Sequence, residues 1–272
     1  MPLKSDIVFK MVFGDARYTD IIQAFLAVTL DIPRQEYSSL KIIDPHLERD
    51  SVDDKLGILD VRVELKNGIL ISVEIQIHET PSMPERVTFS TGRNLSRQIT
   101  PGQEYSKIEK VVTIVISDYD MIKSSEAYHH IFKLYDVERN VLFTDAMEIH
   151  VLELQKLPDE PSLGDKEKEL LSWLRLIRSE EEEEIEMLAT QTAEMGKAVR
   201  RLKRISSSEA ARMRYEARQL YLMDEMARIN AAQAKGRAEG KIETARNLLK
   251  MGLDIDQIVV ATGLSVDEIR KL

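Results

Sequence analysis

The sequence predicts an α/β protein, in which helices flank a mixed β-sheet and an all-helical extension follows at the C-terminus. Two arms at 58–65 and 69–77 alternate between apolar and polar residues around a Lys-Asn-Gly turn, a pattern typical of a β-hairpin. Residues 110–117 form a nearly continuous apolar run, which is typical of a strand buried on both faces. Residues 208–251 are rich in Ala, Arg, Glu, Met and Leu and hold few strand formers, which favours helix.

Two helices and a short strand are expected before the hairpin, at 5–13, 18–30 and 39–43. Gly14 ends the first helix. Pro33 lies just beyond the second, where a proline ring prevents the helix from continuing.

The length of the hairpin loop fixes which residues face each other. With a three-residue loop Leu65 lies opposite Ile69, and counting back places Asp60 directly opposite Glu74. A two-residue loop would pair Asp60 with Ile75 and mix the apolar and polar faces, so the pattern rejects it. Opposed residues have Cβ atoms roughly 5 Å apart, and two carboxylates that close repel unless a positive charge lies between them. A hard divalent cation, which prefers oxygen ligands, is the natural candidate.

A helix and two further strands are expected after the hairpin. The helix covers 84–99 and ends before Pro101. Its thin inner stripe consists of Thr88, Thr91, Leu95 and Ile99. Because a helix connects them, the strand at 110–117 should be parallel to one strand of the hairpin. Residues 148–154 alternate as a later strand, so the order of elements predicts a mixed sheet.

The segment 157–164 contains two prolines and a glycine and is typical of a linker. Because the expected strands and the opposed carboxylates all precede it, we expect residues 1–157 to form one self-contained domain. Residues 158–252 would form a helical, coiled-coil-like extension. Residues 253–272 would form a small helix-turn-helix-like element, because two capping-box patterns frame its turn.

The net charge of −9 conceals two helical segments of opposite sign. Residues 159–196 hold 12 acidic and 4 basic residues, a net of −8, whereas residues 197–250 hold 14 basic and 6 acidic residues, a net of +8. These opposite charges favour pairing between helices at least as much as binding to DNA, so we expect a homo-oligomer through the C-terminal helices. The last helix has about two turns, which is short for reading a major groove, so the terminal element serves either packing or DNA binding.

The composition excludes several classes of protein. The chain has no cysteine, and therefore no disulfide, thiol nucleophile or cysteine-bound zinc. No apolar run approaches the ~18 residues of a membrane helix, and the N-terminus lacks the pattern of a signal peptide. We therefore expect a soluble cytoplasmic protein without a membrane partner. His129 and His130 have no partner at metal-ligand spacing and are expected on the surface.

The expected elements follow one another in the order strand, hairpin, helix and buried strand. The hairpin carries an Asp on one arm and a Glu-x-Gln motif on the other. Short segments accompany them at 5–13, 73–76, 104–107, 149–154 and 263–265. Together they resemble the PD-(D/E)xK nuclease superfamily, and more closely its recombination-promoting nuclease, or transposase-like, branch. The similarity covers most of residues 1–155 and the last twenty residues.

This resemblance implies a restriction-endonuclease-like fold and a metal site. Asp60 and Glu74 would hold Mg²⁺ or Mn²⁺, which polarises the scissile phosphate and lowers the pKa of a bound water. Gln76 takes the place that lysine usually holds in the superfamily. It supplies no charge, but its amide can position a water or a phosphate oxygen by hydrogen bonding.

Other side chains are candidates for the site or for DNA contact, each beside a simpler explanation. Further candidates for the site are Asp6, Lys10 and Gln98. Asp6 is equally explained as an acid in a first helical turn that pairs with Lys10. The candidates for phosphate contact are Arg86, Arg93 and Arg97, which share one face of the helix at 84–99. A solvated helix face explains the same arginines.

The first functional hypothesis is a Mg²⁺-dependent DNA endonuclease. The alternative is a catalytically weak or inactive protein that binds DNA or assembles, and that keeps the nuclease fold while Gln76 replaces the usual lysine. A purely structural helical oligomer is a third possibility, but it would leave the alignment of Asp60 with Glu74 unexplained.

Overall fold

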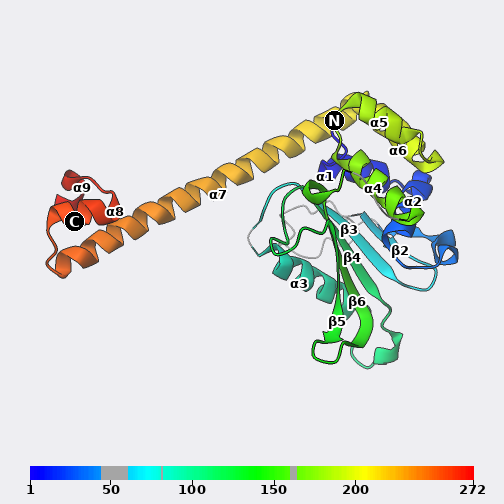
Figure 1. The fold of residues 1–272 in the computed structure, drawn as a ribbon, viewed down its shortest axis with the longest axis horizontal. Coiled ribbons are helices and arrows are strands. Elements are labelled where there is room, and N and C mark those ends of the chain that lie inside the picture. Colours follow the sequence, from blue (N-terminus) through cyan, green and yellow to red (C-terminus); the bar gives the residue numbers. More distant parts are fainter. Residues whose placement is uncertain (44–60, 81, 160–163) are drawn as a thin grey trace. The chain divides into compact units, whose positions relative to one another are not determined.

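The computed structural model describes residues 1–43, 61–80, 82–159 and 164–272 (Figure 1). Contacts divide the chain into two compact units, Met1–Tyr215 and Glu216–Leu272, which are described separately. No helix in these ranges is long and apolar enough to cross a membrane.

Among the described residues, six strands form one mixed sheet in the order β1-β2-β3-β4-β6-β5. The strands are β1 Lys41–Ile43, β2 Val61–Glu64, β3 Leu70–Gln76, β4 Val111–Ser117, β5 His129–Asp136 and β6 Val141–Glu153. β4 runs parallel to both β3 and β6, and the other neighbouring pairs are antiparallel. Every residue of β4 is buried, as its apolar run predicts. The mixed sheet flanked by helices is therefore confirmed.

Helices cover both faces of this sheet (Figure 1). The α-helices of the first unit are α1 Asp6–Phe13, α2 Thr19–Thr29, α3 Met83–Ser96, α4 Asp165–Arg178, α5 Glu182–Ala189 and α6 Ala193–Ser206. Short 3₁₀ helices cover Ala16–Tyr18, Arg34–Ser39, Tyr105–Lys107 and Leu154–Lys156. The third of the expected N-terminal elements is shorter than predicted, because the 3₁₀ turn that ends at Ser39 precedes β1.

The helices after the linker pack differently from the division expected at residue 157. α4 and α6 pack against α2, and α6 also packs against α1. Trp173 of α4 is fully buried, with its ring centroid 5.8 Å from that of Phe13 and 6.2 Å from that of Phe25. These helices therefore share one hydrophobic core with the sheet, because α1 and α2 alone leave their outer faces uncovered.

α3 covers the opposite face of the sheet, and its buried stripe differs from the expected one. Thr88 was expected to face inward, but it is exposed, and its hydroxyl donates to the Pro84 carbonyl oxygen 2.8 Å away. The buried residues of α3 are Met83, Val87, Thr91 and Asn94. Val87 packs with Val115 of β4, and the Thr91 and Thr113 hydroxyl oxygens lie 2.7 Å apart. The face of α3 that packs on the sheet is therefore the one that carries Met83 and Val87, and not the expected one.

The hairpin of β5 and β6 was not expected in full. Only residues 148–154 of β6 were predicted, since apolar side chains on the rest of this hairpin do not alternate with polar ones. The pairing is also irregular, with register shifts on both sides of Leu134. The alternation of apolar and polar residues, from which strands are predicted, is therefore interrupted in this hairpin.

The second unit contains the end of a long helix and two short ones. α7 spans Glu209–Lys250, α8 spans Ile255–Thr262 and α9 spans Val266–Arg270. Asp254 and Ser265 form capping boxes at the starts of α8 and α9, and Gly263 has a φ of +68° in the turn between them. Their buried side chains Ile258 and Ile269 pack on Ala245 of α7. The helix pair expected at the C-terminus is thus present, with its own small core.

Candidate active site

The β2–β3 hairpin has the loop and the register expected from its alternation. The Leu65 N–H donates to the Ile69 carbonyl oxygen at 2.9 Å, and the Gly68 N–H donates to the Leu65 carbonyl oxygen at 3.0 Å. Gly68 has a φ of +86°, a conformation that favours glycine. Val61 pairs with Val73, four residues along from the loop. The three-residue loop is therefore confirmed.

Asp60, the predicted partner of Glu74, lies outside the described residues. The prediction that the two carboxylates oppose each other therefore stays a prediction.

Glu74 lies in the middle of the sheet, on the face covered by α3. It pairs with Val115, which packs against α3, so both side chains point to that face. Glu74 is only 4% exposed. A carboxylate this deeply buried requires compensation by charge or hydrogen bonding.

Burial raises the pKa of Glu74, because removal from water disfavours the charged form. Arg86 of α3, Arg62 of β2 and a hydrogen bond from Gln76 act in the opposite direction. The Nε of Arg62 is buried and has no hydrogen-bond partner among the described residues. Two arginines thus surround Glu74, and one of them keeps a buried donor for an anion.

The donor set at Glu74 fits a hard divalent cation, because a buried carboxylate supplies the oxygen ligands that Mg²⁺ prefers. Within the described ranges, no group of three or more His, Asp or Glu side chains could hold a metal ion. The predicted metal site therefore depends on Asp60 as the second carboxylate.

Gln76 lies two residues after Glu74 on the same face of β3 and is half-buried. Its amide hydrogen-bonds the Glu74 carboxylate. The structure thus brings together two of the three side chains that the sequence grouped.

The three candidate arginines of α3 differ in their surroundings. Arg86 is half-buried and close enough to Glu74 to influence its pKa. Arg93 is half-buried further along the helix, and Arg97 is exposed at its C-terminal cap. Arg86 is therefore the candidate that the structure places at Glu74.

The further candidates from the sequence have local contacts of their own. The Asp6 carboxylate accepts a hydrogen bond of 2.7 Å from the Ile7 N–H in the first turn of α1, and Lys10 is half-buried on the same helix. The Gln98 amide donates to the Glu109 carbonyl oxygen at 2.9 Å and accepts from the Glu109 N–H at 2.7 Å. Gln98 therefore holds the chain before β4, and its part in a site stays a prediction.

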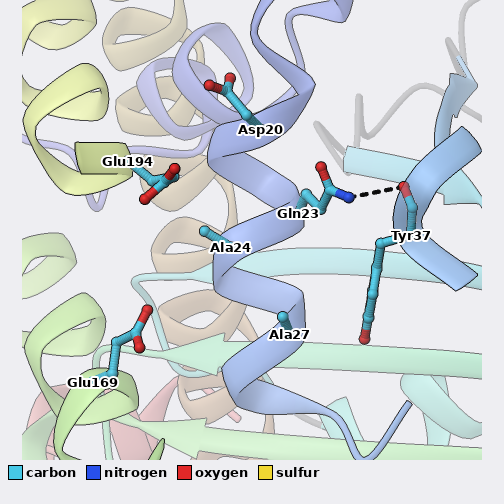
Figure 2. A pocket seen from close by; sticks show the side chains of 7 residues that line it. All are labelled: Asp20, Gln23, Ala24, Ala27, Tyr37, Glu169 and Glu194. Atoms are coloured by element: carbon cyan, nitrogen blue, oxygen red, sulfur yellow. Dashed lines mark hydrogen bonds between the residues drawn. The ribbon is translucent and has the colours of Figure 1, made fainter. Parts of the chain in front are cut away.

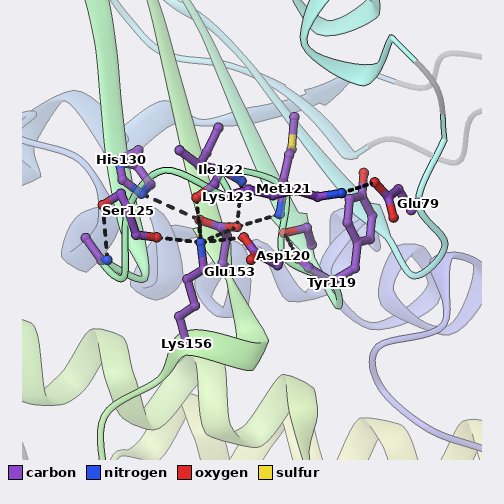
Figure 3. Close-up of polar contacts among 12 residues, drawn as sticks. Glu79, Tyr119, Asp120, Met121, Ile122, Lys123, Ser125, His130, Glu153 and Lys156 are labelled. Atoms are coloured by element: carbon purple, nitrogen blue, oxygen red, sulfur yellow. Dashed lines mark hydrogen bonds and ion pairs between the residues drawn. The ribbon is translucent and has the colours of Figure 1, made fainter.

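Glu153 is a buried carboxylate that the sequence did not single out (Figure 3). It lies in the same row of the sheet as Gln76, since Ser117 pairs with both residues. Its Oε1 accepts from the N–H groups of Met121 and Ile122, at 2.6 and 3.0 Å, and Lys156 lies 3.2 Å away. Glu153 therefore fixes the loop after β4, through partners about thirty residues away that no local pattern reveals.

The loop held by Glu153 also carries Tyr119 (Figure 3). The pKa of Tyr119 is raised, first by burial and then by the charges of Glu79 and Glu153, while Arg86 lowers it. Its hydroxyl is buried without a hydrogen-bond partner among the described residues. Tyr119 thus shares Arg86 as a neighbour with Glu74.

The expected surface position of His129 is wrong, because its ring lies in a half-buried chain of polar groups. His129 Nε2 lies 2.9 Å from His150 Nδ1, and His150 Nε2 lies 2.6 Å from the Glu148 carboxylate. Lys110 and Lys133 pair with the same carboxylate, at 2.5 and 3.2 Å. The missing signal was the strand pairing of β5 with β6, which brings the two histidines together.

Burial and the neighbouring histidines lower the pKa of His129 to about 4. The unfolded chain, with an ordinary histidine pKa of about 6.5, binds this proton more readily between pH 6.5 and 4. His129 should therefore contribute stability above pH 6.5 that is lost as the pH falls toward 4. We expect His129→Gln to show a smaller drop in melting temperature than wild type between pH 7 and pH 4.5.

The control for that measurement is His78→Gln, at an exposed position, which should keep the wild-type drop. An identical drop in both variants would show that His129 is not linked to folding.

A hollow is lined by residues of α2, α4, α6 and the 3₁₀ helix Arg34–Ser39, and Glu74 is not among them (Figure 2). Its lining residues are Asp20, Gln23, Ala24, Ala27, Tyr37, Glu169 and Glu194. Three carboxylates line it, and the Gln23 amide donates to the Tyr37 carbonyl oxygen at 2.9 Å. This surface would repel a phosphate, so the candidate site remains on the α3 face.

Comparison with known protein families finds two matches. Residues 3–232 match the family model described as PD-(D/E)XK nuclease family transposase, and residues 238–272 match that of the Rpn/YhgA-like nuclease family, C-terminal HTH domain. No curated protein and no solved structure matches the chain. The first match includes the whole sheet with Glu74, and the second includes α8 and α9.

Proposed function

The chain belongs to the PD-(D/E)XK nuclease family transposases, and from that membership we propose that it is a Mg²⁺-dependent DNA endonuclease. The proposed reaction is hydrolysis of a phosphodiester bond by water. The observation that carries the proposal is the setting of Glu74, a buried carboxylate hydrogen-bonded by Gln76 and flanked by Arg62 and Arg86.

Asp60 and Glu74 would hold the cation. The pairing of Val61 with Val73 supports this, because Asp60 precedes Val61 and Glu74 follows Val73 in the sequence. Burial raises the pKa of Glu74, and a divalent cation beside it would favour its charged form. When bound, Mg²⁺ or Mn²⁺ polarises the phosphate and lowers the pKa of an attached water.

The protein's own side chains would position the substrate. The Gln76 amide lies close enough to Glu74 for hydrogen bonding to lower the pKa of that carboxyl. The remaining donor and the carbonyl oxygen of the Gln76 amide can orient a water or a phosphate oxygen. Arg62 and Arg86 place positive charge beside Glu74, where the scissile phosphate would gain negative charge during hydrolysis.

DNA is the proposed partner of both units. On the first unit, the proposed phosphate contacts are Arg86, Arg93 and Arg97, in addition to the charge near Glu74. The second unit matches a helix-turn-helix domain, which supports a second contact with DNA. Self-association through the C-terminal helices also stays a proposal. It is supported by exposed apolar side chains along α7, namely Met213, Leu220, Met223, Met226 and Ile229.

A second candidate function is DNA binding or assembly with weak or no hydrolysis. The specific observation in its favour is that Gln76 is neutral and already engaged with Glu74. A lysine would instead offer a positive charge to the water or the phosphate.

Variants of Gln76 separate the two candidates. We expect Gln76→Lys to keep or raise Mg²⁺-dependent cleavage, because lysine restores a charge at this position. Gln76→Leu should lower cleavage about tenfold or more, because it removes a hydrogen bond to a charged group worth ~1.5–3 kcal/mol. The measurement is the initial rate of plasmid cleavage in Mg²⁺ and in EDTA.

Lys66→Leu serves as the control, since Lys66 is exposed in the loop of the same hairpin. Full cleavage by Gln76→Leu would make Gln76 a bystander. Full cleavage in EDTA would overturn metal dependence, and no cleavage by wild type in Mg²⁺ would leave the second candidate function.

A further inference from the structure

The β5–β6 hairpin lies at one end of the sheet (Figure 1). It carries a group of exposed apolar side chains, here called the patch. Its members are Ile131, Phe132, Leu134, Tyr135, Val137, Val141, Leu142 and Phe143. Val137 in the turn is 94% exposed and Phe143 is 84% exposed. Scattered apolar side chains are common on protein surfaces, but eight exposed ones on a single hairpin mark an interaction site.

β5 is also the last strand of the sheet. An edge strand offers unpaired backbone groups, and proteins protect such edges with charges, bulges or a covering element. Here the register shifts beside Leu134 distort the edge, while apolar side chains surround it. Because the distortion discourages pairing of strands edge to edge, a partner would pack on the side chains instead.

A hollow adjoins the base of this hairpin. Its apolar lining consists of Ile69, Leu95, Tyr105, Ile108 and Ala146. Thr144 and Asp145 of β6 also line it, and they follow Phe143 directly in the chain. Tyr105 is 82% exposed, which is unusual for an aromatic ring beside other apolar groups.

From these features we propose that the hairpin of one chain packs into the hollow of a second copy, and that the pair forms a two-fold dimer. A projecting element next to a recess that accepts it is self-complementary, because a two-fold axis makes both contacts at once.

The size of the patch also suits a dimer. A large aromatic side chain has ~150–250 Å² to bury. Eight apolar side chains that are 41–94% exposed approach the ~800 Å² per partner of a stable interface only if both faces of the hairpin are covered, because neighbouring residues of a strand point to opposite faces. A recess that receives the whole hairpin meets this requirement. This contact lies wholly within the first unit and is independent of self-association through the C-terminal helices.

The first test measures self-association of the full chain by sedimentation. Val137→Glu combined with Phe143→Glu should raise the dimer dissociation constant at least ~30-fold, as expected when a buried anchor is lost from an interface. Both side chains are exposed in the single chain, so the fold should keep its melting temperature. The control is Met187→Glu, which replaces an apolar side chain 58% exposed on α5. An unchanged dissociation constant in the double variant overturns the proposal.

The second test places the hairpin directly, without relying on altered charge. Because the chain has no cysteine, introduced cysteines report single contacts. Full-length Val137→Cys and Tyr105→Cys are mixed and treated with a short bismaleimide, and a cross-linked dimer that contains both variants is expected. A mixture of Met187→Cys with Tyr105→Cys should give none. The proposed position of the hairpin in the hollow is overturned if the mixture gives no cross-linked dimer of the two variants. This holds whether or not Val137→Cys cross-links with itself.

Discussion

Glu74→Ala is expected to reduce Mg²⁺-dependent DNA cleavage at least about 100-fold, the loss typical when one preorganised charged or hydrogen-bonding group leaves an active site. Asp60→Ala should have an effect of the same size, because each substitution removes one of the two carboxylates proposed to hold the cation. The measurement is the single-turnover cleavage rate, with saturating protein.

The matched control for both is Glu64→Ala, which removes an exposed carboxylate from β2 of the same hairpin. It should leave the rate within about twofold of wild type, as for a surface change of well under 1 kcal/mol. Glu74→Gln addresses folding, because it keeps the volume of the side chain and removes a charge that burial disfavours. Its melting temperature should match that of wild type while its cleavage is lost. Wild-type rates in both alanine variants would assign the chemistry elsewhere.

A chain that ends at residue 158 is expected not to fold, whereas a chain that ends at residue 215 should fold cooperatively. The shorter chain loses α4, α5 and α6 and with them Trp173, which packs against Phe13 and Phe25. Truncating one such side chain to alanine costs ~3–5 kcal/mol, against a total stability of ~5–15 kcal/mol for a typical protein. Circular dichroism and thermal melting of the two truncated chains provide the measurement.

The control is Trp173→Ala in the chain of 215 residues, which should fold with a lowered melting temperature. A cooperative melting transition in the chain of 158 residues, near that of the longer chain, would show that the sheet and its first two helices suffice. In that case the expected boundary at residue 157 would hold after all.

The sequence predicted the β2–β3 hairpin well because its two constraints are local. The alternation of apolar and polar residues shows which side chains share a face of each strand. Only a three-residue loop puts the apolar residues of both strands on the same face, and this loop length predicts the pairing of Val61 with Val73. The buried strand β4 and the two capping boxes at the C-terminus were equally local signals.

The features that the sequence did not reveal depend on contacts between distant segments. The linker at 157–164 interrupts secondary structure, but a break in secondary structure does not show which side chains meet across it, as Trp173 and Phe13 do. The partners of Glu153 are backbone N–H groups of a remote loop, and those of His129 come from the neighbouring strand. The β5–β6 hairpin lacks the alternation of apolar and polar residues that marks a strand, because apolar side chains also occupy its exposed positions.

The most direct test of the proposed site is the position of a bound cation in a crystal soaked with Mn²⁺, located by its anomalous scattering. We expect a peak within coordination distance of both the Asp60 and Glu74 carboxylates, on the face of the sheet that α3 covers, with the Gln76 amide beside it. A peak away from Glu74, or an Asp60 side chain on the opposite face of the hairpin, would contradict the proposed metal site and the function derived from it.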